Sequence, residues 1–163
     1  MLDEAEVLQF YERTSAEVYR YASRLVGGDL DRAQDLVQET YLTLVRQVNG
    51  GRTEAVDIGW AITTCRSRFL DQLRRHVVVE RARARAFDRS DASTRSDTDD
   101  ATRALGRLGD DQRAALVLRY VDDLTVNDVA VAMGRSVEAV ESLLVRARAA
   151  LRAAYAIERE AGR

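Results

Sequence analysis

The sequence predicts an all-α protein made of two small helical domains joined by a flexible linker, with a helix-turn-helix as the C-terminal domain. The 163-residue chain contains no proline and only nine glycines. Apolar residues recur at helical spacing along most of it, and no strand-like alternation stands out. This apolar periodicity is lost between residues 80 and 100, where most side chains are polar or charged. We therefore predict domains over residues 1–80 and 101–158, with a flexible linker over residues 81–100.

Three helices are predicted in the N-terminal domain. The first runs from about residue 4 to residue 26, where Gly27 and Gly28 end it. Asp31, with a glutamine at the third helical position, is expected to cap a second helix that continues to about residue 48. A loop over residues 49–57 carries turn-forming residues. The third helix then begins near residue 58 and continues to the neighbourhood of residue 79.

The second helix carries two stripes of opposite character. Its buried stripe is predicted to consist of Leu36, Val37, Tyr41, Leu44, Val45 and Val48. The other stripe is expected to face away from the core and consists of Asp35, Gln38, Glu39, Leu42 and Arg46. A mostly polar stripe that faces away from the core is accessible to a partner.

The third helix is also two-sided. Its inward stripe is formed by Ile62, Cys65, Phe69 and Leu73. Its other side carries Trp60, Thr63, Thr64, Ser67, Arg68, Asp71, Arg74 and Arg75. An aromatic ring beside hydroxyls and arginines can stack on bases while the arginines hold phosphates. A solvated helix face with the tryptophan tucked into the core is the alternative interpretation.

The C-terminal domain contains two capped helices joined by a glycine turn. Thr125 is the expected N-cap of the first helix, Gly134 supplies a left-handed turn, and Ser136 is the expected cap of the second helix. This arrangement predicts a helix-turn-helix, a common device for binding duplex DNA. A helical hairpin without a DNA-binding role can show the same pattern.

Composition excludes several classes of function. One cysteine and one histidine cannot build a disulfide framework or the usual tetrahedral zinc site, and we expect neither metal nor cofactor. An enzyme is the weakest hypothesis, because no glycine-rich phosphate loop and no nucleophile with an adjacent base is present. With no long apolar run and an acidic start, we expect a cytoplasmic protein without a membrane partner.

The motifs together resemble those of the extracytoplasmic-function sigma factors, which are small bacterial transcription initiation factors of the sigma-70 family. Residues 33–42, AQDLVQETYL, resemble the family segment AxDLVQETFL, and residues 60–75 resemble WLxxIARNxxxDxLRR. Residues 118–120 match LRY, and Arg146-Ala-Arg148 matches the RAR of the family's C-terminal domain. Several motifs in the right order on both domains are more specific than any one alone.

The resemblance implies a sigma factor that binds core RNA polymerase, through its β′ clamp helices and β subunit, and directs promoter-specific initiation. Polymerase contacts are implied for Asp35, Gln38, Glu39, Leu42 and Arg46. Contacts with the minus-ten promoter element are implied for Trp60, Thr63, Thr64, Arg66, Ser67, Arg68, Asp71, Arg74 and Arg75. Contacts with the minus-thirty-five element are implied for Arg135, Ser136, Glu138, Glu141, Ser142, Arg146 and Arg148.

Three positions in the two helices expected to contact DNA depart from the family pattern. Ser67 replaces an asparagine, while Glu141 and Leu143 stand where relatives often carry basic residues. We therefore expect weak or unusual recognition of the minus-thirty-five element, and poor duplex binding by the free protein, because residues 113–163 carry a charge of only about +1.

Two alternatives stay open. One is a sigma-like decoy or adaptor that binds polymerase or an anti-sigma protein without programming promoters. The other is a stand-alone helix-turn-helix repressor, which predicts a stable dimer, whereas a sigma factor is expected to be a monomer when free.

Overall fold

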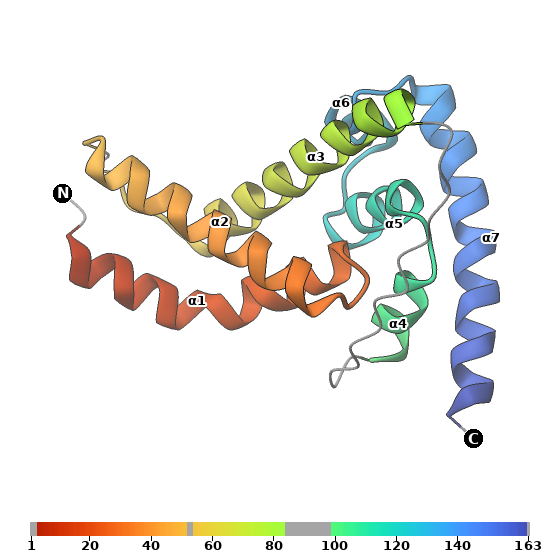
Figure 1. The fold of residues 1–163 in the computed structure, drawn as a ribbon, viewed down its shortest axis with the longest axis horizontal. Coiled ribbons are helices and arrows are strands. Elements are labelled where there is room, and N and C mark those ends of the chain that lie inside the picture. The colour runs from red at the N-terminus through yellow and green to blue at the C-terminus, as the bar shows by residue number, and fades with distance from the viewer. Residues whose placement is uncertain (1–2, 52–53, 84–98, 163) are drawn as a thin grey trace.

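The computed structural model describes residues 3–51, 54–83 and 99–162, and every regular element within them is helical (Figure 1). The predicted all-α fold is therefore confirmed. The N-terminal helices are α1 (Glu4–Leu25), α2 (Leu30–Asn49) and α3 (Ile58–Arg83). The C-terminal elements are α4 (Asp100–Gly106), α5 (Asp110–Leu116), the π-helix η1 (Val117–Val121), α6 (Val126–Met133) and α7 (Val137–Ala161). None of the described helices is long and apolar enough to cross a membrane.

Local signals set the boundaries of α1. Asp3 and Glu6 form a capping box, in which each side chain accepts a hydrogen bond from the other residue's backbone N–H at 2.8 Å. At the other end, Gly27 and Gly28 have φ angles of 66° and 83°. These angles lie in the left-handed region that glycine adopts without steric cost, so the chain turns here into α2.

The predicted cap of α2 is wrong by two residues. Asp29, not Asp31, is the N-cap, and its carboxylate accepts the N–H of Arg32 at 3.1 Å. The two glycines turn the chain directly before Asp29, which places Asp31 inside the first helical turn. Val45 is also predicted to be buried but is 39% exposed, because it lies at the edge of the apolar stripe of α2.

The capping residues of the helix-turn-helix are confirmed. The Thr125 hydroxyl accepts the N–H of Asp128 at 3.1 Å, and the Ser136 hydroxyl accepts the N–H of Ala139 at 3.2 Å. Gly134 ends α6 with a φ angle of 63°. Each hydroxyl satisfies a backbone donor that the first helical turn leaves unpaired, so sequence alone locates both helix starts.

The linker predicted for residues 81–100 falls largely outside the described residues. Residues 81–83 continue α3, and residues 84–98 are not described. Asp99 is the N-cap of α4, where its carboxylate accepts the N–H of Thr102 at 2.8 Å.

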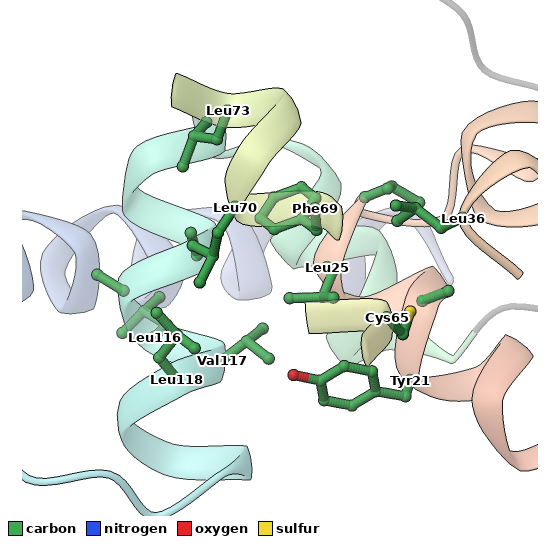
Figure 2. Close-up of a cluster of buried hydrophobic side chains, with 14 of the residues drawn as sticks. Tyr21, Leu25, Leu36, Cys65, Phe69, Leu70, Leu73, Leu116, Val117 and Leu118 are labelled. Atoms are coloured by element: carbon green, nitrogen blue, oxygen red, sulfur yellow. The ribbon is translucent and has the colours of Figure 1, made fainter. Parts of the chain in front are cut away.

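The two groups of helices pack directly against each other. The carboxyl end of α1 contacts α4 and α5, while α3 contacts α6 (Figure 1). Leu70 and Leu73 of α3 belong to the same buried cluster as Leu116, Val117 and Leu118 of α5 and η1 (Figure 2). The apolar core therefore continues from the N-terminal helices into the C-terminal ones.

Candidate protein-binding and nucleic-acid-binding surfaces

The outer stripe of α2 is exposed along its whole length, as the helical period predicts. We call Asp35, Gln38, Glu39, Leu42 and Arg46 the α2 surface, and all five are exposed. Leu42 is 41% exposed, and the exposed Val45 lies one helical turn further along. The Tyr11 ring of α1 is 43% exposed and packs edge-on against Tyr41 at 4.8 Å between ring centroids. The result is an apolar strip beside acidic side chains, which suits a protein partner better than a nucleic acid.

The outer face of α3 carries the arginines and hydroxyls predicted for it. Thr63, Ser67, Arg74 and Arg75 are exposed, whereas Trp60, Thr64, Arg66, Arg68 and Asp71 are half-buried. Arg68 donates to the Thr43 hydroxyl at 3.1 Å, and Arg74 pairs with Asp71 at 3.1 Å. These contacts hold the guanidinium groups at the helix surface, where they form a cationic face.

The exposure of Trp60 is intermediate between the two interpretations that the sequence allows, which are an exposed ring that stacks on bases and a ring tucked into the core. Its ring is half-buried and packs against the apolar core, so it is neither a free stacking platform nor a fully buried residue. The backbone N–H of Trp60 donates to the Asp57 carboxylate at 2.8 Å, which fixes the start of α3 next to the preceding loop. Residues 52 and 53 of that loop are outside the described residues.

Two arginines of α3 have partners in the C-terminal helices that the sequence did not predict. Arg66 pairs with the Asp122 carboxylate at 3.3 Å, and Arg74 donates to the backbone carbonyl of Ala132 in α6. Tyr21 of α1 donates its hydroxyl to the same Asp122 oxygen at 2.8 Å. Burial and the negative charge of Asp122 raise the pKa of Tyr21 well above its ordinary value, so the phenol keeps its proton and remains a donor.

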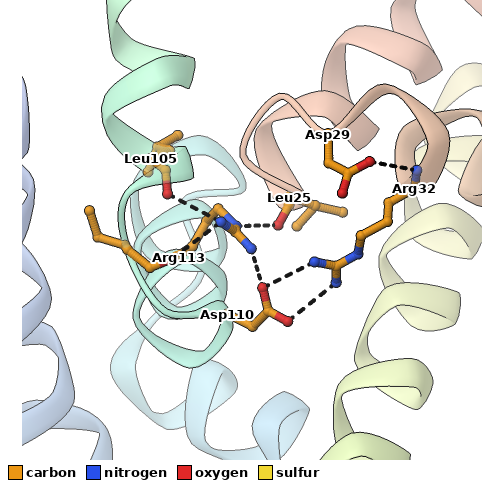
Figure 3. A network of polar contacts seen from close by, with 7 residues as sticks. Leu25, Asp29, Arg32, Leu105, Asp110 and Arg113 are labelled. Carbon is orange, nitrogen blue, oxygen red and sulfur yellow. Dashed lines mark hydrogen bonds and ion pairs between the residues drawn. The ribbon is translucent and has the colours of Figure 1, made fainter. Parts of the chain in front are cut away.

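A second polar network joins the N-terminal and C-terminal groups of helices at the carboxyl end of α1 (Figure 3). Arg113 is 3% exposed and donates to the carbonyls of Leu25, Leu105 and Leu108 at 2.7, 3.2 and 3.3 Å. It also pairs with Asp110, whose two oxygens accept from Arg32 at 3.3 Å each. Burial lowers the pKa of Arg113 while the Asp110 carboxylate opposes the shift. One guanidinium thus connects α1, α4 and α5.

The helix-turn-helix presents most of its predicted residues to solvent. Ser136, Glu138, Glu141, Ser142, Arg146 and Arg148 are exposed at the amino end and along one side of α7. Arg135 is half-buried and pairs with Asp111, while Arg148 donates to the Tyr120 hydroxyl at 2.9 Å. Leu143 is 3% exposed, so this departure from the family pattern belongs to the core and not to the exposed face.

Cys65 is fully buried as predicted, and burial raises the pKa of its thiol to about 12 while a hydrogen bond with Thr40 acts in the opposite direction. The thiol therefore stays protonated and unreactive at neutral pH. The described parts of the chain also contain no group of three metal-binding side chains.

Comparison with known protein families agrees with the order of these surfaces. The family model "Sigma-70 region 2" matches residues 10–77, which span most of α1, all of α2 and the surface of α3 described above. The model "Sigma-70, region 4" matches residues 98–151, which include α4 to α6 and the amino-terminal part of α7.

The curated relatives of the chain are RNA polymerase sigma factors. It is 30% identical over 137 residues to the ECF RNA polymerase sigma factor EcfG of Rhodopseudomonas palustris, which covers 78% of this chain and 74% of that protein. It is 28% identical over 150 residues to the ECF RNA polymerase sigma factor BldN of Streptomyces coelicolor, covering 85% of this chain. The chain spans 56% of BldN, somewhat more than half of that relative's length.

A solved structure has the same fold. The sigma factor RpoE from Bartonella quintana, solved in complex with the anti-sigma factor NepR, aligns over 90% of this chain and 94% of that chain. The TM-score is 0.55 and the sequence identity is 24%.

Proposed function

The chain belongs to the extracytoplasmic-function sigma factors of the sigma-70 family, and we propose that it binds core RNA polymerase and directs it to specific promoters. The observation that carries this proposal is the presence of sigma-70 regions 2 and 4 in order on one chain. The bond-forming chemistry of transcription belongs to the polymerase in this proposal. The chain contributes binding energy that favours the melted promoter over the duplex.

The α2 surface is the proposed site of contact with polymerase. Its exposed carboxylates, Asp35 and Glu39, can pair with basic residues on the β′ clamp helices, and Leu42, about one helical turn beyond Glu39, supplies an apolar anchor. A partly exposed leucine bordered by charged side chains is a typical arrangement for the centre and rim of a protein interface.

A substitution in the α2 surface tests this proposal. We expect Leu42→Glu to weaken binding to core RNA polymerase about tenfold or more, because an acid would replace the apolar anchor at the centre of the interface. Ile157→Glu is the matched control, since Ile157 is 48% exposed and lies on α7, away from the α2 surface. Titration of labelled protein with core enzyme measures both affinities. Equal affinities for the two variants would contradict the assignment of this surface.

The arginine-rich face of α3, with Trp60 and the preceding loop, is the proposed site for the minus-ten element. Arginines hold phosphates, while hydroxyls and the half-buried indole are suited to an unstacked base. Ser67 is exposed in the position where relatives carry asparagine, so we expect a changed base preference in this element.

The amino end of α7 is the proposed reader of the minus-thirty-five element in the major groove. Arg146 and Arg148 can hold phosphate or guanine, and Glu141 can accept a hydrogen bond from the amino group of cytosine. Because Glu138 and Glu141 also repel phosphates, we propose that duplex binding requires polymerase to position the domain.

An anti-sigma protein is a candidate further partner, since RpoE was solved in complex with one. The decoy hypothesis rests on exposed Ser67 and Glu141, which change the two proposed DNA-binding faces. It predicts tight binding to polymerase without transcript starts. A sigma factor is expected to bind polymerase tightly and also to give transcript starts.

A further inference from the structure

The half-buried arginine of the proposed minus-ten face already has an anionic partner within the chain. Asp122 Oδ2 lies 3.3 Å from the Arg66 guanidinium and accepts the Tyr21 hydroxyl at 2.8 Å. The side chain of Asp122 is only 7% exposed, and that of Arg66 is 23% exposed. A carboxylate therefore already pairs with one nitrogen of the guanidinium that a DNA phosphate or base would need.

The backbone around Asp122 holds that carboxylate in an uncommon geometry. It follows the π-helix η1, and its N–H donates to the Val117 carbonyl at 3.0 Å, five residues earlier. The next residue, Asp123, has a φ angle of 52°, in the left-handed region that aspartate tolerates better than most residues. π-helical turns recur at functional sites because they redirect side chains. Here the turn directs Asp122 toward α1 and α3.

The contact is one part of a wider closed arrangement. Arg74 donates to the Ala132 carbonyl of α6, so a second arginine of the same face is engaged by the helix-turn-helix. The Arg113 network and the shared apolar cluster hold the neighbouring ends of the helices together (Figures 2 and 3). The described structure therefore brings α6, the first helix of the helix-turn-helix, against the proposed reader of the minus-ten element.

We propose that Asp122 is an intramolecular lock, which withholds Arg66 from DNA while regions 2 and 4 are packed together. This inference rests on the proposed function, since it needs Arg66 to be a DNA contact. The apparent DNA affinity of the closed protein is lower than that of the open protein by the fraction of molecules that are open. Polymerase, by separating the two regions, would release Arg66 at the time when the promoter is engaged.

The test compares two variants that remove the same charge from neighbouring positions. Asp122→Asn weakens the ion pair with Arg66 at constant size, because a neutral acceptor binds a guanidinium less strongly than a carboxylate does. Asp123→Asn is the control, since the Asp123 side chain is 97% exposed and pairs with Arg119 of the same segment at 3.6 Å, not with Arg66. Both variants raise the net charge by one, so any general gain in attraction to DNA is the same.

The full-length proteins are titrated without polymerase against a fluorescein-labelled single-stranded DNA of random sequence. We expect Asp122→Asn to bind about tenfold more tightly than Asp123→Asn, and its radius of gyration in small-angle scattering to exceed that of the wild type. Equal DNA affinities for the two variants would overturn the lock. Asp122→Ser, which also removes the carboxylate, is the second variant if Asp122→Asn does not fold, and a gain in affinity is expected from it too.

The failure of this inference can be separated from the failure of the proposed function. If Asp122→Asn binds DNA more tightly but no variant supports transcription with core polymerase, the lock stands and the initiation function fails. If the wild type initiates transcription but both asparagine variants bind DNA equally, the function stands and the lock is wrong.

Discussion

Replacing Gly106 by alanine is expected to destabilise the closed arrangement of the two regions by about 2 kcal/mol, in the range typical of overpacking. A Cβ at this position would lie closer than 3.0 Å to the backbone carbonyl oxygen of Gly27, which ends α1. Backbone atoms cannot rotate away as a flexible side chain can, so α4 must separate from α1. In an isolated helix the same change favours the folded state, because alanine is the better helix former.

The sign of the effect therefore reports whether the two regions pack in solution. Urea unfolding followed by circular dichroism measures the stability, and small-angle scattering measures the radius of gyration. Gly162→Ala is the matched control, since Gly162 lies at the carboxyl end of α7 as Gly106 does at that of α4, and its added Cβ would meet only ordinary van der Waals contact at 3.6 Å. A Gly106→Ala protein that is as compact as the wild type and at least as stable would show that this contact does not form.

Replacing Arg113 by methionine is expected to cost about 3 kcal/mol of unfolding free energy, because two buried carbonyl groups and one partly buried carbonyl group lose their charged donor. Methionine fills a similar volume but donates no hydrogen bond. Lysine is expected to recover only part of the loss, since one ammonium group cannot reach all the acceptors that the planar guanidinium reaches from one position.

The control for Arg113 is an exposed arginine of α1. Arg20→Met changes the same residue type at the surface, where substitutions usually alter stability by less than about 0.5 kcal/mol. Urea unfolding curves for the three Arg113 and Arg20 variants give the comparison. If Arg113→Met were as stable as Arg20→Met, the buried network would contribute nothing to the fold.

The fold was predictable where the determinants are local. The caps Thr125 and Ser136 and the turn at Gly134 follow from side chains that bond to the backbone within three residues, so a short window of sequence contains the whole signal. The cap of α2 was misplaced because two aspartates lie two residues apart. Only the turn made by the preceding glycines selects Asp29.

The candidate surfaces were predictable to different extents. The α2 surface follows from helical periodicity alone, and its five residues are exposed as expected. The partners of Arg66 and Arg74 could not be predicted, since they lie 56 and 58 residues away in the sequence. The π-helix that directs Asp122 has no sequence signal that we can identify. The partners of Arg66 and Arg74 depend on how the N-terminal and C-terminal helices pack, which a short window of sequence does not contain.

The most direct test of the account is transcription by purified core RNA polymerase on fragmented GC-rich bacterial DNA, with and without this protein, followed by mapping of the RNA 5′ ends. A promoter-specific initiation factor predicts reproducible starts that require the protein and share upstream sequence elements. Polymerase binding without such starts would contradict the account and favour the decoy, and the absence of both would leave a stand-alone DNA-binding protein.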